Sequence, residues 1–327
     1  MYLGCLLTQN NINSILYYSH SDLQMEILID ETSCYYVGSR GLLKCCDCKS
    51  ATPWSSVREV INQDFGGLKN GDSIYICSSA LSHFVSNILD QISVRFVLVT
   101  GDSDAFVPTT ALSDAEFHKL IRSDKLIAWF SQNLVGSPIE YPKLHYLPIG
   151  LDYHTMSERE LFWGPVSSPK TQEVILNAVI THAQPFHMRI PTAYTTFHFA
   201  LHRGGRQEAY EQIPPDLVYY EPERTSRLVS WKRQIEYAFV VSPPGEGIDC
   251  HRTWEALCLG CIPILLSTPL DPLYDGLPVL IVKSWKDVTR ELLEKTIVEY
   301  RDKPFLMEKL SLQYWVDKIR SASASGR

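Results

Sequence analysis

The sequence predicts an α/β fold that consists of two parallel, doubly wound sheets, one in each half of the chain. Short apolar runs alternate with amphipathic helical patterns in both halves, which is typical of parallel sheets covered by helices. The stretch SERELFWGPVSSPKTQ, rich in Trp, Gly, Pro and Ser, interrupts this alternation near residues 155 to 170. The 327 residues, of which 45% are hydrophobic, suffice for two cores of ordinary size.

The first half reads as a run of strands that are separated by helices. Strands are expected in EILIDE, SIYIC, VRFVLVT, KLIAWFSQN and KLHYLPIGL. Helices are expected in SVREVINQDF, SHFVSNILDQI and AEFHKLIRS, and a Gly-Gly pair ends the first of them. We therefore assign residues 1–160 to a first Rossmann-like domain.

The second half restarts the same pattern. Strands are expected in TAYTTFHFAL, DLVYYE, YAFVV, IPILL and LPVLIV, and helices in RQEAYEQI, SRLVSWKRQI and WKDVTRELLEKTIVEYR. We assign residues 161–305 to a second Rossmann-like domain. Residues 306–327 are expected to form a terminal helix, LMEKLSLQYWVDKIRSA, and a disordered tail, SASASGR, because the tail lacks apolar side chains that could pack.

The most informative motif is SPPGEGIDCHRTWEALCLGCIPI, which begins at Ser242. It predicts a strand end, a glycine-rich turn, a short helix and a second strand. We expect Ser242, Gly245 and Gly247 at a ligand site, where the glycines would let backbone N–H groups approach the ligand at the positive end of the helix. Arg252 could hold a phosphate there, and Glu255, one turn later, suits the paired hydroxyls of a ribose. The alternative is an ordinary βαβ crossover with Glu255 on a solvated face.

This motif, followed by STPLDPLYDGLPVLIV, resembles the nucleotide-sugar-binding half of exostosin-like glycosyltransferases, especially the short forms of large algal DNA viruses. The resemblance is sharp over about residues 236 to 290, weaker over FHFALHRGGRQEAYE and WFSQN…PIGLDYHTM, and fades before residue 90. It implies a GT-B architecture, in which two Rossmann-like domains face a central cleft and a terminal helix crosses back to the first. It also implies an inverting mechanism, a nucleotide-diphosphate sugar donor, UDP above all, and a glycan or glycoconjugate acceptor.

A leaving nucleoside diphosphate needs positive charge around it. Arg252, the backbone of residues 245–251, and one of Arg203 or Arg206 are the candidates, and Arg206 matches an arginine that the resembled family carries after a strand. The segment from Asp102 to Asp104 fits a D-x-D metal motif formally, but it lies in the wrong half for a donor metal. We therefore expect neither a metal nor a cofactor.

Inverting transfer also needs a general base on the acceptor side, which we expect in the first domain. Asp102 and Asp104 in the turn GDSD follow a predicted strand, and ligands of open α/β sheets lie beyond such strand ends. His154 follows another strand and is the rival base, because its ordinary pKa lies near working pH. Each of the three could instead be a turn, capping or core residue.

Composition argues against several other classes of protein. The net charge is −7 and the basic residues are scattered, so we expect no nucleic-acid partner. No run approaches the ~20 apolar residues of a membrane helix, and MYLGCLLTQN lacks the features of a signal peptide. The odd number of cysteines, nine, favours reduced thiols. We therefore expect a soluble, cytoplasmic protein.

Two other functions remain open at this point. A GT-B epimerase or hydrolase would act on the nucleotide sugar without an acceptor. A non-catalytic glycan- or nucleotide-binding module would bind the donor without turnover.

Overall fold

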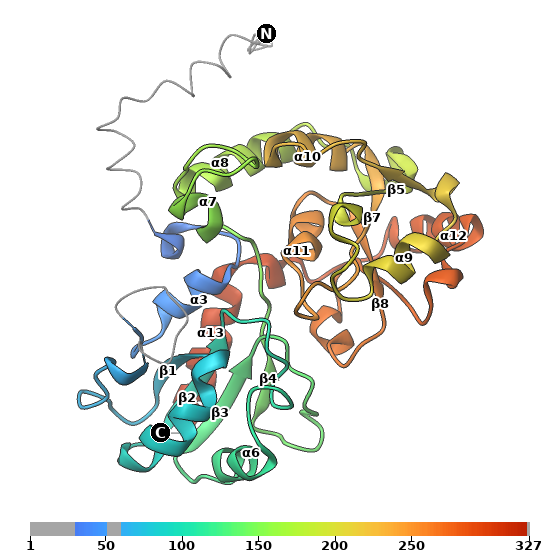
Figure 1. Cartoon of the computed structure of the whole chain (residues 1–327). Coiled ribbons are helices and arrows are strands. Elements are labelled where there is room, and N and C mark those ends of the chain that lie inside the picture. Colours follow the sequence, from blue (N-terminus) through green and yellow to red (C-terminus); the bar gives the residue numbers. More distant parts are fainter. Residues whose placement is uncertain (1–29, 51–59, 326–327) are drawn as a thin grey trace, which may run out of the picture.

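The computed structural model describes residues 30–50 and 60–325, which form two α/β domains (Figure 1). The first sheet has the order β1-β2-β3-β4 and consists of β1 (Asp72–Cys77), β2 (Phe96–Gly101), β3 (Leu126–Ser131) and β4 (Leu144–Tyr146). The second has the order β6-β5-β7-β8-β9 and consists of β5 (Ile190–Thr195), β6 (Val218–Tyr220), β7 (Tyr237–Val241), β8 (Ile262–Leu266) and β9 (Leu280–Val282). All pairings within the two sheets are parallel. This confirms the predicted fold class, two Rossmann-like domains in a GT-B arrangement.

The central strands are buried along their whole length. Every residue of β2, FVLVTG, and of β7, YAFVV, is buried. Helices on both faces of a parallel sheet cause this, and they explain why the strands read as continuous apolar runs. The predicted strand EILIDE lies mostly outside the described residues, and so does the start of the predicted helix SVREVINQDF.

The helices named below cover the sheets or join the domains. They are α3 (Ser39–Cys45), α6 (Asp114–Ile121), α7 (His154–Glu158), α8 (Pro169–Ile180), α9 (Arg206–Gln212), α10 (Arg227–Gln234), α11 (His251–Cys258), α12 (Arg290–Tyr300) and α13 (Leu312–Ser325). The expected helix after β1 consists of short α, π and 3₁₀ segments between Ser78 and Gln91.

The segment between the domains contains α8, a helix that our sequence interpretation missed. The pair Ser168-Pro169 is a helix-start signal in the sequence. In the structure Ser168 is the N-cap and accepts a hydrogen bond from the Thr171 N–H, and Pro169 is the first residue of the helix. The buried carboxylate of Glu173 on α8 accepts from the N–H groups of Tyr35 and Tyr36 at 2.6 and 3.0 Å. Although α8 follows the predicted boundary, it therefore binds first-domain backbone.

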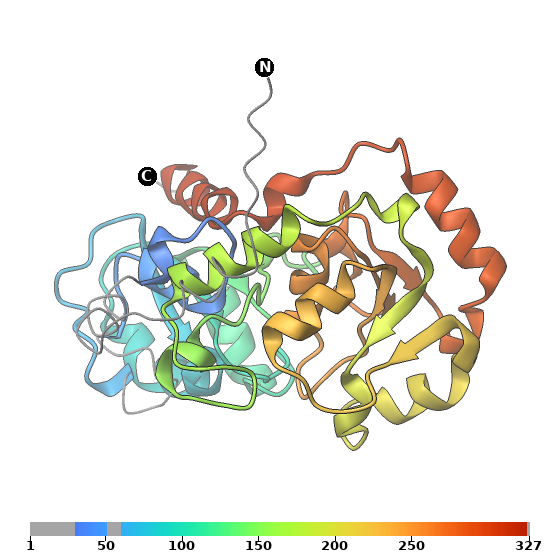
Figure 2. The ribbon, with the colours of Figure 1, turned by 90° about the horizontal axis from the view of Figure 1, so that it is seen from above.

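The chain returns to the first domain at its end. After α12, residues 301–311 pass back across the molecule and α13 packs against α3 and the first sheet (Figure 2). The N–H of Val37 donates to Leu310 O at 2.9 Å, and Leu312 N–H donates to Tyr35 O at 2.8 Å. The expectation of a disordered tail from Ser321 is wrong as far as Ser325, because α13 continues to that residue. Ser323 is buried there and donates to Ile319 O at 3.2 Å.

Strand β5 is shorter than the sequence suggested. It ends at Thr195, and Phe197–Ala200 form a 3₁₀ turn in place of continued strand. The Thr195 hydroxyl donates to Val241 O at 3.2 Å and accepts from Phe197 N–H at 3.3 Å. The bond from Thr195 to Val241 joins the end of β5 to the end of β7, where the cleft begins.

Candidate active site

A cleft of about 710 Å³ lies between the two domains and is lined by residues of both. On the second domain the cleft opens at β5, which lies between β6 and β7. The chain passes from β5 to β6 on one side and then crosses to β7 on the other side. Such a reversal of strand order is the usual ligand site of an open α/β sheet. The loop after β7 that carries SPPGEG lines this cleft through Gly245, Glu246 and Gly247.

Two close contacts of glycine residues shape the loop. Gly204 has φ +48°, and a Cβ there would lie 2.6 Å from Gly245 O. A Cβ on Gly247 would lie 2.9 Å from Nδ2 of Asn133, a first-domain residue that follows β3. Glycine is required at position 204, where a side chain would meet loop backbone at a left-handed φ, whereas at position 247 the Asn133 side chain would have to move.

Arg206 and Arg252 face each other across the loop. Arg206 Nε donates to Pro244 O at 3.2 Å and Arg252 Nη1 to Pro243 O at 3.4 Å, but within the described residues neither forms an ion pair. Burial, and next the charge of Arg252, lower the pKa of Arg206 to about 10, and burial also lowers the pKa of Arg252. Two guanidinium groups beside the glycine loop, from the first turns of α9 and α11, are suited to an anion such as a diphosphate.

Among the remaining residues predicted for the donor site, Arg203 and Glu255 line the cleft and Ser242 does not. Arg203 lines the cleft and lies 3.6 Å from the Glu246 carboxylate in an exposed pair. Glu255 also lines the cleft. Ser242 is buried behind the loop, where its hydroxyl bonds that of Thr253 at 2.9 Å, and it does not line the cleft.

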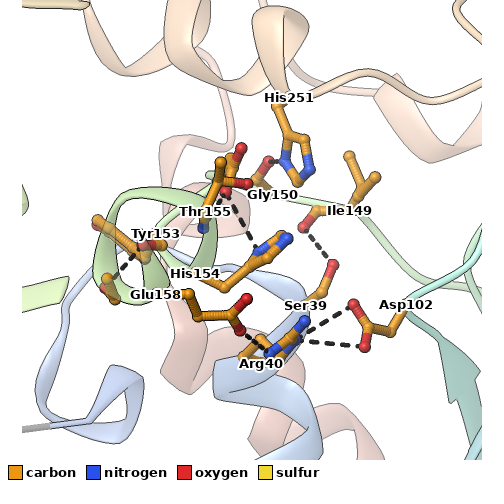
Figure 3. Close-up of polar contacts among 12 residues, drawn as sticks. Ser39, Arg40, Asp102, Ile149, Gly150, Tyr153, His154, Thr155, Glu158 and His251 are labelled. Atoms are coloured by element: carbon orange, nitrogen blue, oxygen red, sulfur yellow. Dashed lines mark hydrogen bonds and ion pairs between the residues drawn. The ribbon is translucent and has the colours of Figure 1, made fainter. Parts of the chain in front are cut away.

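The two aspartates of GDSD point to different places. Asp104 is exposed and lines the cleft. Asp102, at φ +55°, has its carboxylate 3.3 Å from Arg40 Nε, and Arg40 Nη1 also lies 2.8 Å from Glu158 (Figure 3). The Asp102 carboxylate therefore belongs to a nearly buried ion network beside the cleft.

His154 opens α7 and is paired with a carboxylate. Its Nδ1 lies 3.2 Å from Asp152 Oδ1, and its ring centroid lies 6.0 Å from that of His251. Burial lowers the pKa of His154; Asp152 opposes this shift, and His251 contributes to it. The pKa of Asp152 is itself lowered, because His251, His154 and Arg227 outweigh the opposing effect of burial. This arrangement keeps the imidazole of His154 neutral and oriented near pH 7, as a general base requires.

Asp249 joins the domains, a role that we did not predict. It does not cap α11, because the N-cap is Cys250, which makes no side-chain cap bond. The buried Asp249 carboxylate instead accepts from Ile149 N–H at 2.8 Å, Trp254 Nε1 at 2.9 Å and Tyr274 OH at 2.9 Å. Only the tertiary fold brings these distant donors together.

Further contacts fix the two cleft walls to each other. Asn133 Oδ1 accepts from the Asp249 N–H at 2.9 Å, and the His251 ring nitrogen Nδ1 lies 2.7 Å from Gly150 O (Figure 3). The glycine loop and the start of α11 are thus bonded to the first domain directly.

Residues 30–50 and 60–325 contain neither a cluster of possible metal ligands nor a membrane-spanning helix. No group of three or more His, Cys, Asp or Glu side chains there is placed to hold a metal ion. Among the helices of the same residues, none has the length and apolar character to cross a bilayer.

Comparison with known proteins gives distant structural matches only. No protein-family model matches the chain, and no curated protein matches its sequence. Two UDP-forming α,α-trehalose-phosphate synthases are similar in structure. The Burkholderia vietnamiensis protein is 9% identical over 82% of this chain and 74% of its own, with a TM-score of 0.36. The Burkholderia xenovorans protein is 9% identical over 83% and 76%, with a TM-score of 0.40.

An E. coli structure described as trehalose-6-phosphate bound with UDP-2-fluoro glucose matches at 10% identity, over 82% of this chain and 74% of that chain, with a TM-score of 0.36. At these identities and scores, the family and the reaction of this chain remain proposals.

Proposed function

We propose that this protein is a glycosyltransferase that moves a sugar from a nucleotide-diphosphate donor, UDP-linked, to a hydroxyl of a glycan or glycoconjugate. The observation that carries the proposal is the pair Arg206 of α9 and Arg252 of α11 beside the glycine loop, which has carbonyl partners but no ion-pair carboxylate among the described residues. The diphosphate would bind there, with Glu255 on the ribose hydroxyls and Arg203 at the mouth of the cleft.

The proposed mechanism is inverting and needs one base on the first-domain wall. The base takes the proton of the acceptor hydroxyl while its oxygen attacks the anomeric carbon and the bond to the diphosphate breaks. Asp104 lines the cleft. His154 does not line it, but its ring contacts Asp152, which does, so Asp104 and His154 are the stronger candidates. Asp102 is the weaker one, because Arg40 engages its carboxylate. Arg206 and Arg252 stabilise the charge of the departing diphosphate.

Nucleotide binding tests this proposal most directly. Calorimetry with UDP should show that Arg252→Ala and Glu255→Ala each weaken binding about tenfold to a hundredfold, because a charge-assisted hydrogen bond is worth about 1.5–3 kcal/mol. Arg233→Ala is the matched control, since this exposed arginine of α10 pairs with Glu236, lies over the Tyr219 ring and does not line the cleft. Equal UDP affinity in all four proteins would sink the nucleotide assignment.

Turnover separates the proposal from its alternatives. Incubation with a UDP-sugar alone would give rapid, full conversion by an epimerase or hydrolase, whereas a transferase needs the acceptor. A binding module would retain the donor unchanged. Each reaction is run with excess EDTA as well, where we expect turnover to persist because arginines stabilise the leaving group.

A further inference from the structure

Arg227, the first residue of α10, lies where the two walls of the cleft meet. Its backbone N–H donates to Trp163 O at 2.9 Å. The guanidinium carbon lies 5.2 Å from the ring centroid of Trp163 and 5.7 Å from that of Trp231. The side chain is only 10% exposed, and the two indoles hold its planar head in one orientation.

The donor groups of this guanidinium are divided between the domains. Nη1 donates to Asp152 O at 2.7 Å and to Gln172 Oε1 at 2.9 Å. Nη2 lies 3.5 Å from the Asp152 carboxylate, and Nε lies 3.5 Å from the carboxylate of Glu255 on α11. One positive charge thus faces a first-domain carboxylate and a second-domain carboxylate.

Each of the two carboxylates lies at a place with a proposed role in transfer. Asp152 contacts His154, the base candidate, and Glu255 lines the donor part of the cleft. The charged and titratable groups that act on His154 from the surrounding elements are Asp152 before α7, Arg40 of α3, Asp102 after β2 and His251 of α11. Because Arg227 partly compensates the charge of Asp152, it weakens the attraction that Asp152 exerts on a proton of His154.

We propose that Arg227 is a positioning residue that links the donor-site carboxylate Glu255 to the Asp152–His154 pair. One side chain would then orient both the residue proposed to hold the ribose and the candidate base. The proposal rests on the proposed function, in which Glu255 holds the ribose and His154 is a candidate base. Arg227 itself need not touch a substrate, and its effect is transmitted through the two carboxylates.

The first test replaces Arg227 and follows both ends of the link. In Arg227→Gln we expect UDP affinity to fall about tenfold by calorimetry, because Glu255 loses its orienting partner. The same variant should show a higher pKa of His154 by NMR titration, because Asp152 is no longer compensated. Arg233→Gln, on the same helix but exposed and outside the cleft, should change neither value.

A second variant protects the test against a folding defect of the first. In Glu255→Gln, the charge of Arg227 acts on Asp152 alone, so the pKa of His154 should fall, which is the opposite direction from Arg227→Gln. If Arg227→Gln melts well below the parent protein, Arg227→Lys takes its place, since lysine keeps the charge but loses the planar fork.

The outcomes separate the two proposals. If the parent protein does not bind UDP, the proposed function fails and the positioning role fails with it. If the parent binds UDP normally but the Arg227 variants keep both its affinity and the His154 pKa, the positioning role alone is overturned. In Arg227→Gln, a change in only one of the two values also contradicts the link. Arg227→Lys keeps the charge beside Asp152, so it should lower UDP affinity and leave the His154 pKa near that of the parent.

Discussion

At the scale of single residues, the two aspartates of the GDSD turn differ in their exposure and in their partners. Asp102 is held by Arg40 in a nearly buried ion pair, and Asp104 is exposed at the cleft. Asp102→Asn should lower the free energy of unfolding by about 1–3 kcal/mol, because Arg40 loses a charged partner. Asp104→Asn should leave that free energy unchanged.

The same two variants test the base assignment. If Asp104 is the base, its Asn variant keeps UDP affinity and loses turnover about 10²–10⁴-fold. Urea melts and initial rates, measured on both variants, give the comparison. Equal loss of stability in both would contradict the difference in burial that separates these residues.

The pH dependence of His154 follows from its depressed pKa. The unfolded chain binds a proton at this residue at about pH 6.5, before the folded chain does. Stability is therefore highest above that value, and it falls as the pH drops toward the lower folded pKa. Urea melts at pH 7.5 and 5.5 should show this loss, and His154→Asn should reduce it, whereas His182→Asn, at an exposed histidine, should not. A base with this pKa would place the acid limb of kcat/KM below pH 6.5.

At the scale of elements, the glycine loop depends on its contact with the segment before α9. Gly204→Ala would place a Cβ 2.6 Å from Gly245 O at φ +48°. We expect this variant to lower stability by about 1–3 kcal/mol and to weaken UDP binding, because the loop that positions Arg206 must shift. Gly205→Ala is the control, since a Cβ there meets nothing within 4 Å and φ is −87°. Equal UDP affinity and equal melting temperatures in the two variants would refute this account.

At the scale of the whole molecule, the last helix completes the first domain. Trp315 on α13 is buried, and its Nε1 donates to Lys309 O at 2.8 Å. Trp315→Ala should therefore cost about 3–5 kcal/mol. Hydrogen exchange should show that protection falls in β1, β2 and β3 before it falls in β7 and β8.

The control for this helix is Gln313→Ala. Gln313 is exposed on α13, and its side chain donates to Asp317 on the same helix at 2.7 Å. It should leave protection in both sheets unchanged. Loss of protection confined to the second sheet in Trp315→Ala would show that α13 does not brace the first domain.

The sequence by itself determined the two sheets and the glycine loop, because their signals are local. The period of apolar residues places β2 and β7, and Gly245 lies in a turn between an apolar run and a short helix. It also identified α9 and α11, which carry Arg206 and Arg252. Chemistry within one short segment is readable without the fold.

Only the tertiary structure decided which of these residues meet. Arg227 lies 75 residues from Asp152, and Asp249 lies 100 residues from Ile149, so no local pattern announces either contact. Asp102 and Asp104 were indistinguishable in the sequence, and the burial of Arg40 beside one of them separates the two. The reason is physical: partners of buried charges are chosen by the packing of whole domains, which sequence spacing does not record.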